Sequence, residues 1–258
     1  MTLRPRLILA DLDGTLLRFG ETQVTPEVAE MIKLLEASGV KVCVVTGRPF
    51  ESAKAILQSV PIINPSIFYG GGSVIDPLTG TVLWQKTIPQ QSALQALHIL
   101  KEVALNIDYG LGHTDPKVMV VESITHDPIQ IWARIPTDLT DQIVTKLRYI
   151  SGLAIHVNFG VQDATKQVGL YINHHEADKF HATSSLLRLM NIKKGHTLAI
   201  ADGGNDLPLF AAAQFKIAMG NAAENVKSAA DYVVASVDNN GFCEAMKTFV
   251  LNSSLSHS

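Results

Sequence analysis

The chain has 258 residues, of which 47% are hydrophobic and 17% charged, with a formal net charge of −3. This composition is too apolar for a disordered protein, and the charge gives no general attraction to nucleic acids or other polyanions. The apolar runs are too short to cross a membrane. From the charge and the apolar runs together, we expect neither a nucleic acid nor a membrane as partner.

The amino terminus leads directly into the apolar run of residues 7–10, which is too short, and too soon followed by acids, for a secretory signal. We therefore expect a cytoplasmic protein. Its two cysteines, Cys43 and Cys243, are far apart in sequence, and we interpret both as core thiols without a disulfide.

Short apolar runs recur along the chain, and each ends in polar and glycine residues followed by a helical stretch. They cover residues 7–10, 40–45, 198–201 and 215–219. Such runs are typical of strands buried on both faces of a parallel sheet. The alternation predicts a doubly wound, Rossmann-like α/β core.

Helix signals follow the first two strands. Thr25 is a predicted N-cap, with Pro26 in the first turn and Gly39 at the end of the helix. Pro49 opens a second helix that runs through Leu57.

The alternation of single strands and helices changes between residues 84 and 175. There we predict the order helix, two strands, helix, two strands, over residues 90–105, 118–122, 129–135, 139–150, 153–157 and 168–172. Paired strands between helices indicate a smaller α+β domain inserted into the first. We therefore expect a core of residues 1–83 plus 176–258 and an inserted cap of residues 84–175.

Acidic residues follow two of the predicted parallel strands. Asp11-Leu12-Asp13-Gly14-Thr15 follows the first, with both carboxylates on one side, and Asp202-Gly203-Gly204-Asn205-Asp206 follows residues 198–201. Ligands of open α/β sheets bind at the carboxyl ends of the strands, and clustered carboxylates favour a hard cation such as Mg²⁺. The alternatives are an ordinary Asp-Gly turn and a helix cap.

Two further segments are ambiguous when taken alone. Thr46-Gly47-Arg48 follows residues 40–45, where Thr46 fits a helix cap as well as an anion site. Lys179, just after the inserted segment, fits a solvated surface lysine.

Taken together, Asp11-x-Asp13-Gly14-Thr15, Thr46-Gly47-Arg48, Lys179 and Asp202-Gly203-x-Asn205-Asp206 resemble, in order and spacing, the four motifs of the haloacid dehalogenase superfamily. The insertion resembles the cap (C2B type) of its Cof-type, class IIB sugar phosphatases. The chain departs from that pattern at Gly71-Gly72-Ser73, Phe180 and Ala201.

The resemblance implies a phosphatase in which Asp11 is the nucleophile and Asp13 the general acid and base. It places Mg²⁺ on the Asp11 and Asp202 side chains and the Asp13 main-chain oxygen. The phosphate-binding set that we infer comprises Leu12, Thr46, Gly47, Arg48, Lys179 and Asn205, and Asp206 orients Lys179 or a metal-bound water. The expected partner is a small phosphorylated metabolite, and the protein is expected to be a monomer or homodimer.

The inserted segment supplies the residues that we would test for specificity: Tyr109, His113, His126, Trp132, Arg134 and His156. His174-His175-Glu176 suggests a second metal site, but we expect adjacent strand residues to point to opposite faces, which disfavours it. Two rival functions remain open: a phosphomutase on the same scaffold and a non-catalytic sugar-phosphate sensor.

Overall fold

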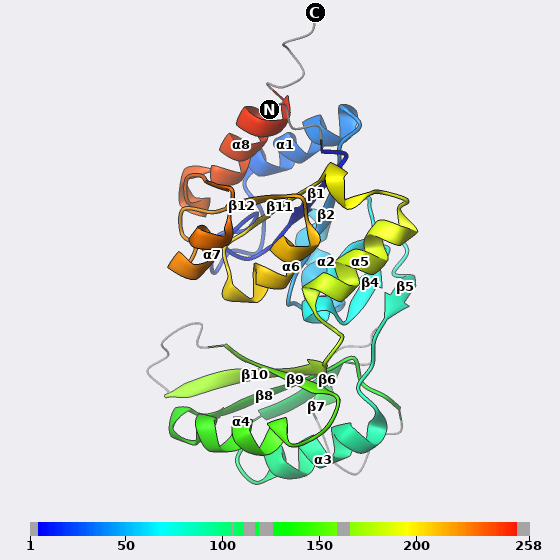
Figure 1. Ribbon diagram of the computed structural model, residues 1–258, viewed down its shortest axis with the longest axis vertical. Helices are drawn as coiled ribbons and strands as arrows, with labels where there is room; N and C mark the ends of the chain where they lie inside the picture. The colour runs from blue at the N-terminus through cyan, green and yellow to red at the C-terminus, as the bar shows by residue number, and fades with distance from the viewer. Residues whose placement is uncertain (1–4, 105, 111–116, 119–125, 159–165, 252–258) are drawn as a thin grey trace, which may run out of the picture.

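The computed structural model describes residues 5–104, 106–110, 117–118, 126–158 and 166–251. Its larger part is built on a parallel sheet with the strand order β13-β12-β11-β1-β2 (Figure 1). The strands are β1 Leu7–Ala10, β2 Lys41–Val44, β11 Thr197–Ala201, β12 Phe215–Ala218 and β13 Tyr232–Val233. Successive strands run outward from β1 in both directions, which is the doubly wound arrangement that the sequence predicts.

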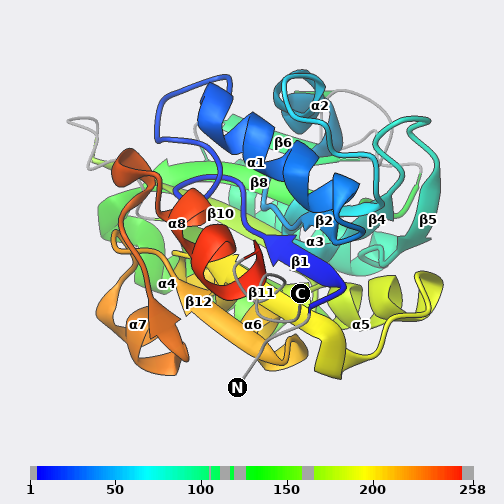
Figure 2. The same cartoon turned by 90° about the horizontal axis from the view of Figure 1, so that it is seen from above.

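Helices cover both faces of this sheet (Figure 2). Residues of α1, α2 and α8 pack with Ile8, Val42 and Ile200 on one face. Residues of α5, α6 and α7 pack with Leu9, Cys43 and Ala199 on the other. The helices are α1 Pro26–Ala37, α2 Phe50–Gln58, α5 Lys179–Leu189, α6 Leu207–Ala212, α7 Glu224–Ala229 and α8 Gly241–Met246.

The predicted start of α1 is confirmed. The Thr25 side chain accepts a hydrogen bond from the Val28 N–H, and Pro26 occupies the first turn, where its missing N–H costs nothing. The helix buries Val28, Met31, Ile32 and Leu35 against the sheet, as their helical spacing predicts. Both cysteines are buried free thiols.

A small antiparallel sheet, β3 Ser66–Phe68, β4 Ser73–Ile75 and β5 Val82–Gln85, adjoins the edge of β2, where Thr46 N donates to Ile67 O. The sequence prediction omits this sheet. Its strands are too short, and β5 too exposed on alternate residues, to produce a long apolar run. Strand β5 spans residues 83 and 84, where we expected the boundary between the core and the inserted cap.

A second unit, which we call the antiparallel unit, lies beyond the carboxyl ends of the parallel strands (Figure 1). Its sheet has the order β7-β6-β8-β10-β9. The elements are α3 Gln90–Lys101, β6 Asn106–Gly110, β7 Lys117–Val118, β8 Gln130–Pro136, α4 Thr140–Arg148, β9 Leu153–Asn158 and β10 Gln167–His174. The chain enters the unit through residues 86–89 and leaves it through residues 174–178.

Helices α3 and α4 cover one face of the antiparallel sheet. Ile131, Ala133 and Ile135 of β8, with Leu170 and Ile172 of β10, form a core with these helices. Because side chains alternate along a strand, the intervening residues point to the other face, toward the parallel sheet. Helix α3 ends at Lys101 rather than at residue 105, and β6 is a strand that the sequence prediction omits. Most of the predicted strand 118–122 lies outside the described residues.

Short turns of 3₁₀ or π helix complete the described chain, at Tyr69–Gly71, Thr137–Leu139, Lys194–His196, Gly204–Asp206, Val237–Asn239 and Lys247–Leu251. Within the described ranges, none of the helices combines the length and apolar character that a membrane crossing requires.

Candidate active site

Two aspartates far apart in sequence meet where strands β1 and β11 end. The strands pair in parallel, with Ala10 opposite Ile200, so the residues that follow them emerge side by side. Asp11 and Asp202 are respectively 8% and 9% exposed. Together with buried Asp206, each offers a carboxylate oxygen within 4.8 Å of the others. The neighbouring strand ends thus gather a buried acidic cluster.

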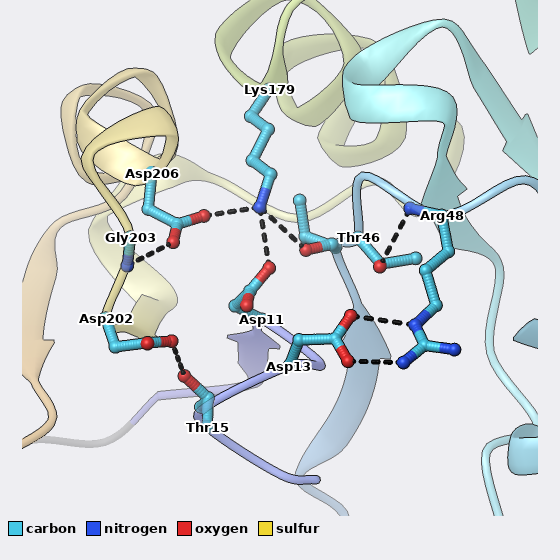
Figure 3. A network of polar contacts seen from close by, with 10 residues as sticks. Asp11, Asp13, Thr15, Thr46, Arg48, Lys179, Asp202, Gly203 and Asp206 are labelled. Carbon is cyan, nitrogen blue, oxygen red and sulfur yellow. Dashed lines mark hydrogen bonds and ion pairs between the residues drawn. The ribbon is translucent and has the colours of Figure 1, made fainter. Parts of the chain in front are cut away.

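Lys179 carries the positive charge that contacts this cluster. It is the first residue of α5, whose N-cap Asp178 accepts from His181 N, and its side chain extends toward the sheet (Figure 3). The ammonium donates to Asp11 Oδ1 at 2.7 Å, to the Val45 carbonyl at 3.0 Å and to Asp206 Oδ1. It is 2% exposed, so the interpretation as a surface lysine is excluded.

Asp202 is held in place from two sides. Thr15 Oγ1 donates to its Oδ1 at 3.0 Å, and Asn221 Nδ2 donates both to its Oδ2 and to the Gly14 carbonyl. Gly14 has φ +81°, and a Cβ there would be 2.2 Å from Asp202 Oδ2. Only glycine therefore permits this close approach of the turn to the carboxylate.

Asp13 lies beside Arg48 rather than within the acidic cluster. Arg48 Nε and Nη2 donate to the two Asp13 oxygens at 2.8 and 2.6 Å, which is a bidentate pair (Figure 3). Both side chains are about one-third exposed, at 33% and 34%. The pair lies at the solvent-accessible side of the site, where an incoming molecule can reach it.

The remaining predicted residues differ in what they can offer. Buried Thr46 uses its hydroxyl to accept from Arg48 N at 3.1 Å. A Cβ on Gly47 would meet open space. Asn205 is exposed, on the turn Gly204–Asp206. The Leu12 side chain is fully buried, so only its main chain is available to a ligand.

The burial of these charges shifts their proton affinities. Burial raises the pKa of Asp11 well above its ordinary value, and Asp206 raises it further although Lys179 lowers it. Burial, followed by the charge of Asp206, raises the pKa of Asp202 to about 6. Burial opposes the charge on Lys179, but Asp11 and Asp206 outweigh it and raise the lysine pKa. The cluster holds three carboxylates but a single ammonium, which contacts only Asp11 and Asp206, so a bound cation would relieve the excess of negative charge.

The antiparallel unit presents aromatic and basic side chains toward this site. The Arg48 pKa is raised first by its hydrogen bond to Asp13, and the electrostatic influence of Tyr171 and Asp11 adds to this. Tyr171 of β10 lies two residues before Asn173, whose Nδ2 donates to the Tyr69 carbonyl of the larger part of the protein, so both side chains face the parallel sheet. Trp132 and His156 are directly opposite Tyr171 on β8 and β9 and share its face of the sheet. Arg134 lies over the Trp132 ring, with Cζ 5.6 Å from the ring centroid.

Two of the other three residues that we would test for specificity lie within the described part of the chain. His126 is exposed at the approach to β8, and Tyr109 lies on β6. His113 lies outside the described residues. The predicted site residues include neither Tyr171 nor Asn221. Asn221 belongs to Met219-Gly220-Asn221-Ala222, a segment just after β12 that resembles a tail element of the same subfamily, and this was a signal that could have identified it.

The expected divergence of His174 and His175 is wrong. Strand β10 ends at His174 and the chain turns at His175, so the alternation of side chains ends there. The two ring centroids are 4.3 Å apart, and one potential ligand atom from each ring and from Glu176 lie within 4.8 Å of one another.

Comparison with known proteins gives a family match over most of the chain. The model of the haloacid dehalogenase-like hydrolases matches residues 8–123 and 122–246. The putative phosphatase YxeH of Bacillus subtilis is 26% identical, over 95% of this chain and 98% of that protein. The pyridoxal phosphate phosphatase YbhA of Escherichia coli is 27% identical, over 89% of this chain and 93% of that protein.

Solved structures share the fold. A phosphatase of the haloalkanoate enzyme superfamily, BT1666 of Bacteroides thetaiotaomicron, superimposes with a TM-score of 0.78 at 24% identity, over 96% of this chain and 95% of that one. The subclass IIB sugar phosphatase BT4131 gives a TM-score of 0.76 at 22% identity, over 95% and 98% of the two chains.

Proposed function

Because the chain belongs to the haloacid dehalogenase-like hydrolase family, we propose that it is a Mg²⁺-dependent phosphatase acting through an aspartyl-phosphate on Asp11. The enzyme is a phosphoric monoester hydrolase, the class of its named relatives. The observation that carries the proposal is the buried cluster of Asp11, Asp202 and Asp206 in contact with Lys179. The stability of the fold does not require so much buried negative charge. A metal-assisted reaction with an anionic phosphate explains why the charge is there.

The donor set fits a hard divalent cation. Carboxylate and carbonyl oxygens are the ligands that Mg²⁺ prefers, and it keeps positions for water and phosphate oxygens. The Asp11 and Asp202 carboxylates, with the Asp13 main-chain oxygen, would hold the ion. When bound, Mg²⁺ would offset the repulsion between the Asp11 carboxylate and the phosphate.

In the first half of the proposed reaction, an Asp11 oxygen attacks phosphorus and the bond from phosphorus to the leaving oxygen breaks. Asp13 gives its proton to that oxygen, which departs as an alcohol. In the second half, Asp13 takes a proton from water, and this water attacks the phosphorus of the aspartyl-phosphate. Inorganic phosphate leaves and the Asp11 carboxylate is restored.

This role for Asp13 requires a change in the pair that it forms with Arg48. Both Asp13 oxygens accept from Arg48, so neither is free to contact a leaving group while the pair persists. We propose that the substrate phosphate competes for Arg48 and releases Asp13, so that the acid becomes available when substrate is bound. The exposure of the pair supports this order of events.

The oxygens of the transferring phosphate would be held by Lys179, Thr46 and Asn205, with the main chain of Leu12 and Gly47 nearby. Lys179 supplies a buried charge at Asp11, and Asp206 fixes the direction of its ammonium. Thr46 would exchange its contact with Arg48 N for one with phosphate.

We propose further that residues 84–175 form a cap that selects the substrate, over a core of residues 1–83 and 176–258. The separate hydrophobic core of the antiparallel unit supports this division. The row of Trp132, Tyr171 and His156 would contact the leaving group. Aromatic faces of this kind suit a substrate that carries a sugar or heteroaromatic ring, with the phosphate directed to Asp11.

Replacing Tyr171 by alanine is expected to raise KM by about 10-fold with a smaller effect on kcat, because it removes binding that the ground state and transition state share. Tyr149→Ala is the matched control, since Tyr149 is 87% exposed at the end of α4, and its KM should equal that of wild type. Steady-state kinetics with the preferred substrate test this. An unchanged KM in Tyr171→Ala would remove the β10 face from the binding site.

The stabilising effect of Mg²⁺ is expected to increase with pH. The pKa of Asp202 in the folded protein, about 6, exceeds that of an unfolded-chain aspartate, about 3.9. Protonated Asp202 therefore favours the folded state, and the metal-free protein loses this stability as pH rises from about 4 through about 6. Mg²⁺ binds the deprotonated carboxylate and should restore the lost stability.

Thermal melts at about pH 5 and about pH 7.5, with and without Mg²⁺, measure this effect, and the larger shift is expected at the higher pH. Asp202→Asn is the control, in which the dependence on both Mg²⁺ and pH should be much weaker. Equal Mg²⁺ shifts at the two pH values in wild type would contradict the assignment of Asp202 as a ligand.

The overall function is tested by phosphate release from a panel of phosphorylated metabolites, with and without Mg²⁺. We expect release from a subset of the panel, only with the metal, and without any sugar-bisphosphate activator such as a mutase needs. If wild type and Asp11→Asn release equal phosphate throughout, the chain is not a phosphatase of this mechanism.

A further inference from the structure

Two imidazoles and a carboxylate meet where the chain leaves the antiparallel unit. His174 ends β10, and His175 and Glu176 form the turn that follows. The two rings are 4.3 Å apart between centroids, with an angle of 32° between their planes. One potential ligand atom from each of the three residues lies within 4.8 Å of the other two. The group is separate from the acidic cluster at Asp11.

The surrounding contacts leave one imidazole lone pair free and engage the other two ligand groups in contacts that a metal ion can displace. His175 Nδ1 lies 3.3 Å from the Gly152 carbonyl, and donation to that oxygen leaves Nε2 with a free lone pair. Metal-binding histidines are commonly oriented in this way, by a carbonyl on the other ring nitrogen. His174 Nδ1 accepts from Glu176 N at 3.1 Å, so a metal ion bound at this nitrogen would replace that hydrogen bond. The Glu176 side chain is 45% exposed.

The present partner of Glu176 is Lys86, whose ammonium pairs with its Oε2. Lys86 follows β5, where the chain enters the antiparallel unit, so this ion pair joins the two crossings between the units. A divalent cation can replace an exposed monovalent ammonium because exposed ion pairs contribute little stability. The lysine is 37% exposed and has room to move away.

We infer that His174, His175 and Glu176 form a binding site for a divalent transition-metal ion of the zinc class. Imidazole nitrogen favours Zn²⁺, Co²⁺ or Ni²⁺ over Mg²⁺, and two histidines with one glutamate form a donor set used for such ions. Three protein ligands leave a further position for water. Ligand atoms around tetrahedral zinc are about 3.4 Å apart, so small side-chain rotations in this exposed turn would complete the site.

Binding of this ion would also change the link between the two units. Glu176 would turn from Lys86 on the entering segment toward His174 and His175 on the leaving segment. The ion pair between the crossings would be lost, and Lys86 would be released. The ion and Lys86 therefore compete for the same carboxylate.

Zn²⁺ titration of the full-length protein by calorimetry, with Mg²⁺ in excess to occupy carboxylate sites, tests the inference. We expect one Zn²⁺ per chain in wild type, with affinity reduced about 100-fold in His174→Gln/His175→Gln. Lys86→Met should tighten binding several-fold, because the competing cation is gone. Co²⁺ absorption in the visible region gives a second readout that does not depend on enzyme activity.

His98→Gln, which changes an exposed histidine of α3, and Asp202→Asn, which changes the acidic cluster, are the matched controls and should keep wild-type zinc affinity. Circular dichroism shows whether each variant is folded. The inference is overturned if the double histidine variant binds zinc as tightly as wild type. It is equally overturned if zinc binding is lost in Asp202→Asn, or if Lys86→Met leaves the affinity unchanged.

Discussion

Replacing Asp11 by asparagine is expected to reduce the rate of phosphate release by about 10⁴-fold or more while the protein stays folded. An amide cannot form the acyl phosphate by the same attack, and loss of a nucleophile removes most of an enzyme's chemical rate enhancement. The substitution also removes one of three clustered negative charges. Because burial and neighbouring carboxylates raise the Asp11 pKa, its charge is unfavourable in the metal-free folded state.

We therefore expect the thermal midpoint of metal-free Asp11→Asn to be about 2–4 °C above that of wild type. The matched control is Asp138→Asn, the same chemical change on an exposed turn, which should alter neither rate nor stability. Phosphate-release kinetics and thermal melts on the three proteins measure both effects. Near-normal turnover in Asp11→Asn would contradict its role as nucleophile, whatever the stability.

Replacing Lys179 by methionine is expected to lower both activity and stability. The substitution leaves Asp11 and Asp206 buried without the ammonium that contacts them both. Removing one partner of a buried ion pair typically costs about 3–5 kcal/mol of unfolding free energy. Independently of stability, the loss of a charge that stabilises the transferring phosphate should lower kcat by a factor of about 100 or more.

A double variant separates the two effects. Lys179→Met/Asp206→Asn removes a buried carboxylate together with the lysine and should recover part of the lost stability, while activity stays low. Lys33→Met, at an exposed surface pair with Glu30, is the control and should resemble wild type. Denaturant unfolding and steady-state kinetics provide the measurements. If the double variant recovers activity along with stability, Lys179 has a structural role and does not act on the phosphate.

The sequence predicts the central strands well because their burial dictates their composition. Strands buried on both faces are largely apolar, so β1 and β11 appear as short apolar runs, and their observed ends agree with the prediction to within one residue. The antiparallel unit is harder to predict. Strand β6 contains polar residues, and Val103 and Ala104 extend the apolar pattern of α3 beyond the point where the helix ends at Lys101.

The convergence of Asp11 and Asp202 follows from topology, because the ends of adjacent parallel strands are close in any such sheet. Lys179 begins α5 rather than following a strand of that sheet, so only the family resemblance predicted its place in the site. The pairing of Arg48 with Asp13 does not follow, since it depends on side-chain rotamers in the segment after β2. The position of Tyr171 depends on how the antiparallel unit lies over the parallel sheet, which no local pattern encodes.

The adjacent rings of His174 and His175 show how the alternation of side chains fails at the end of a strand. Side-chain alternation holds within β10 and ends with it, so a rule that is correct for Leu170 and Ile172 fails two residues later.

The central position of β1 has a consequence for synthesis on the ribosome. Leu7 pairs with Thr197 of β11, which lies 190 residues further along the chain, so one edge of β1 stays unpaired until β11 has been translated. Pairings of such high sequence separation form slowly, and an open strand edge invites association with other chains. A ribosome-bound chain in which β11 has not yet been made also lacks Asp202, and Asn221, which holds Asp202, follows later still. The nascent protein should therefore be exposed to misassociation until β11 has emerged, and its acidic cluster cannot be completed before then.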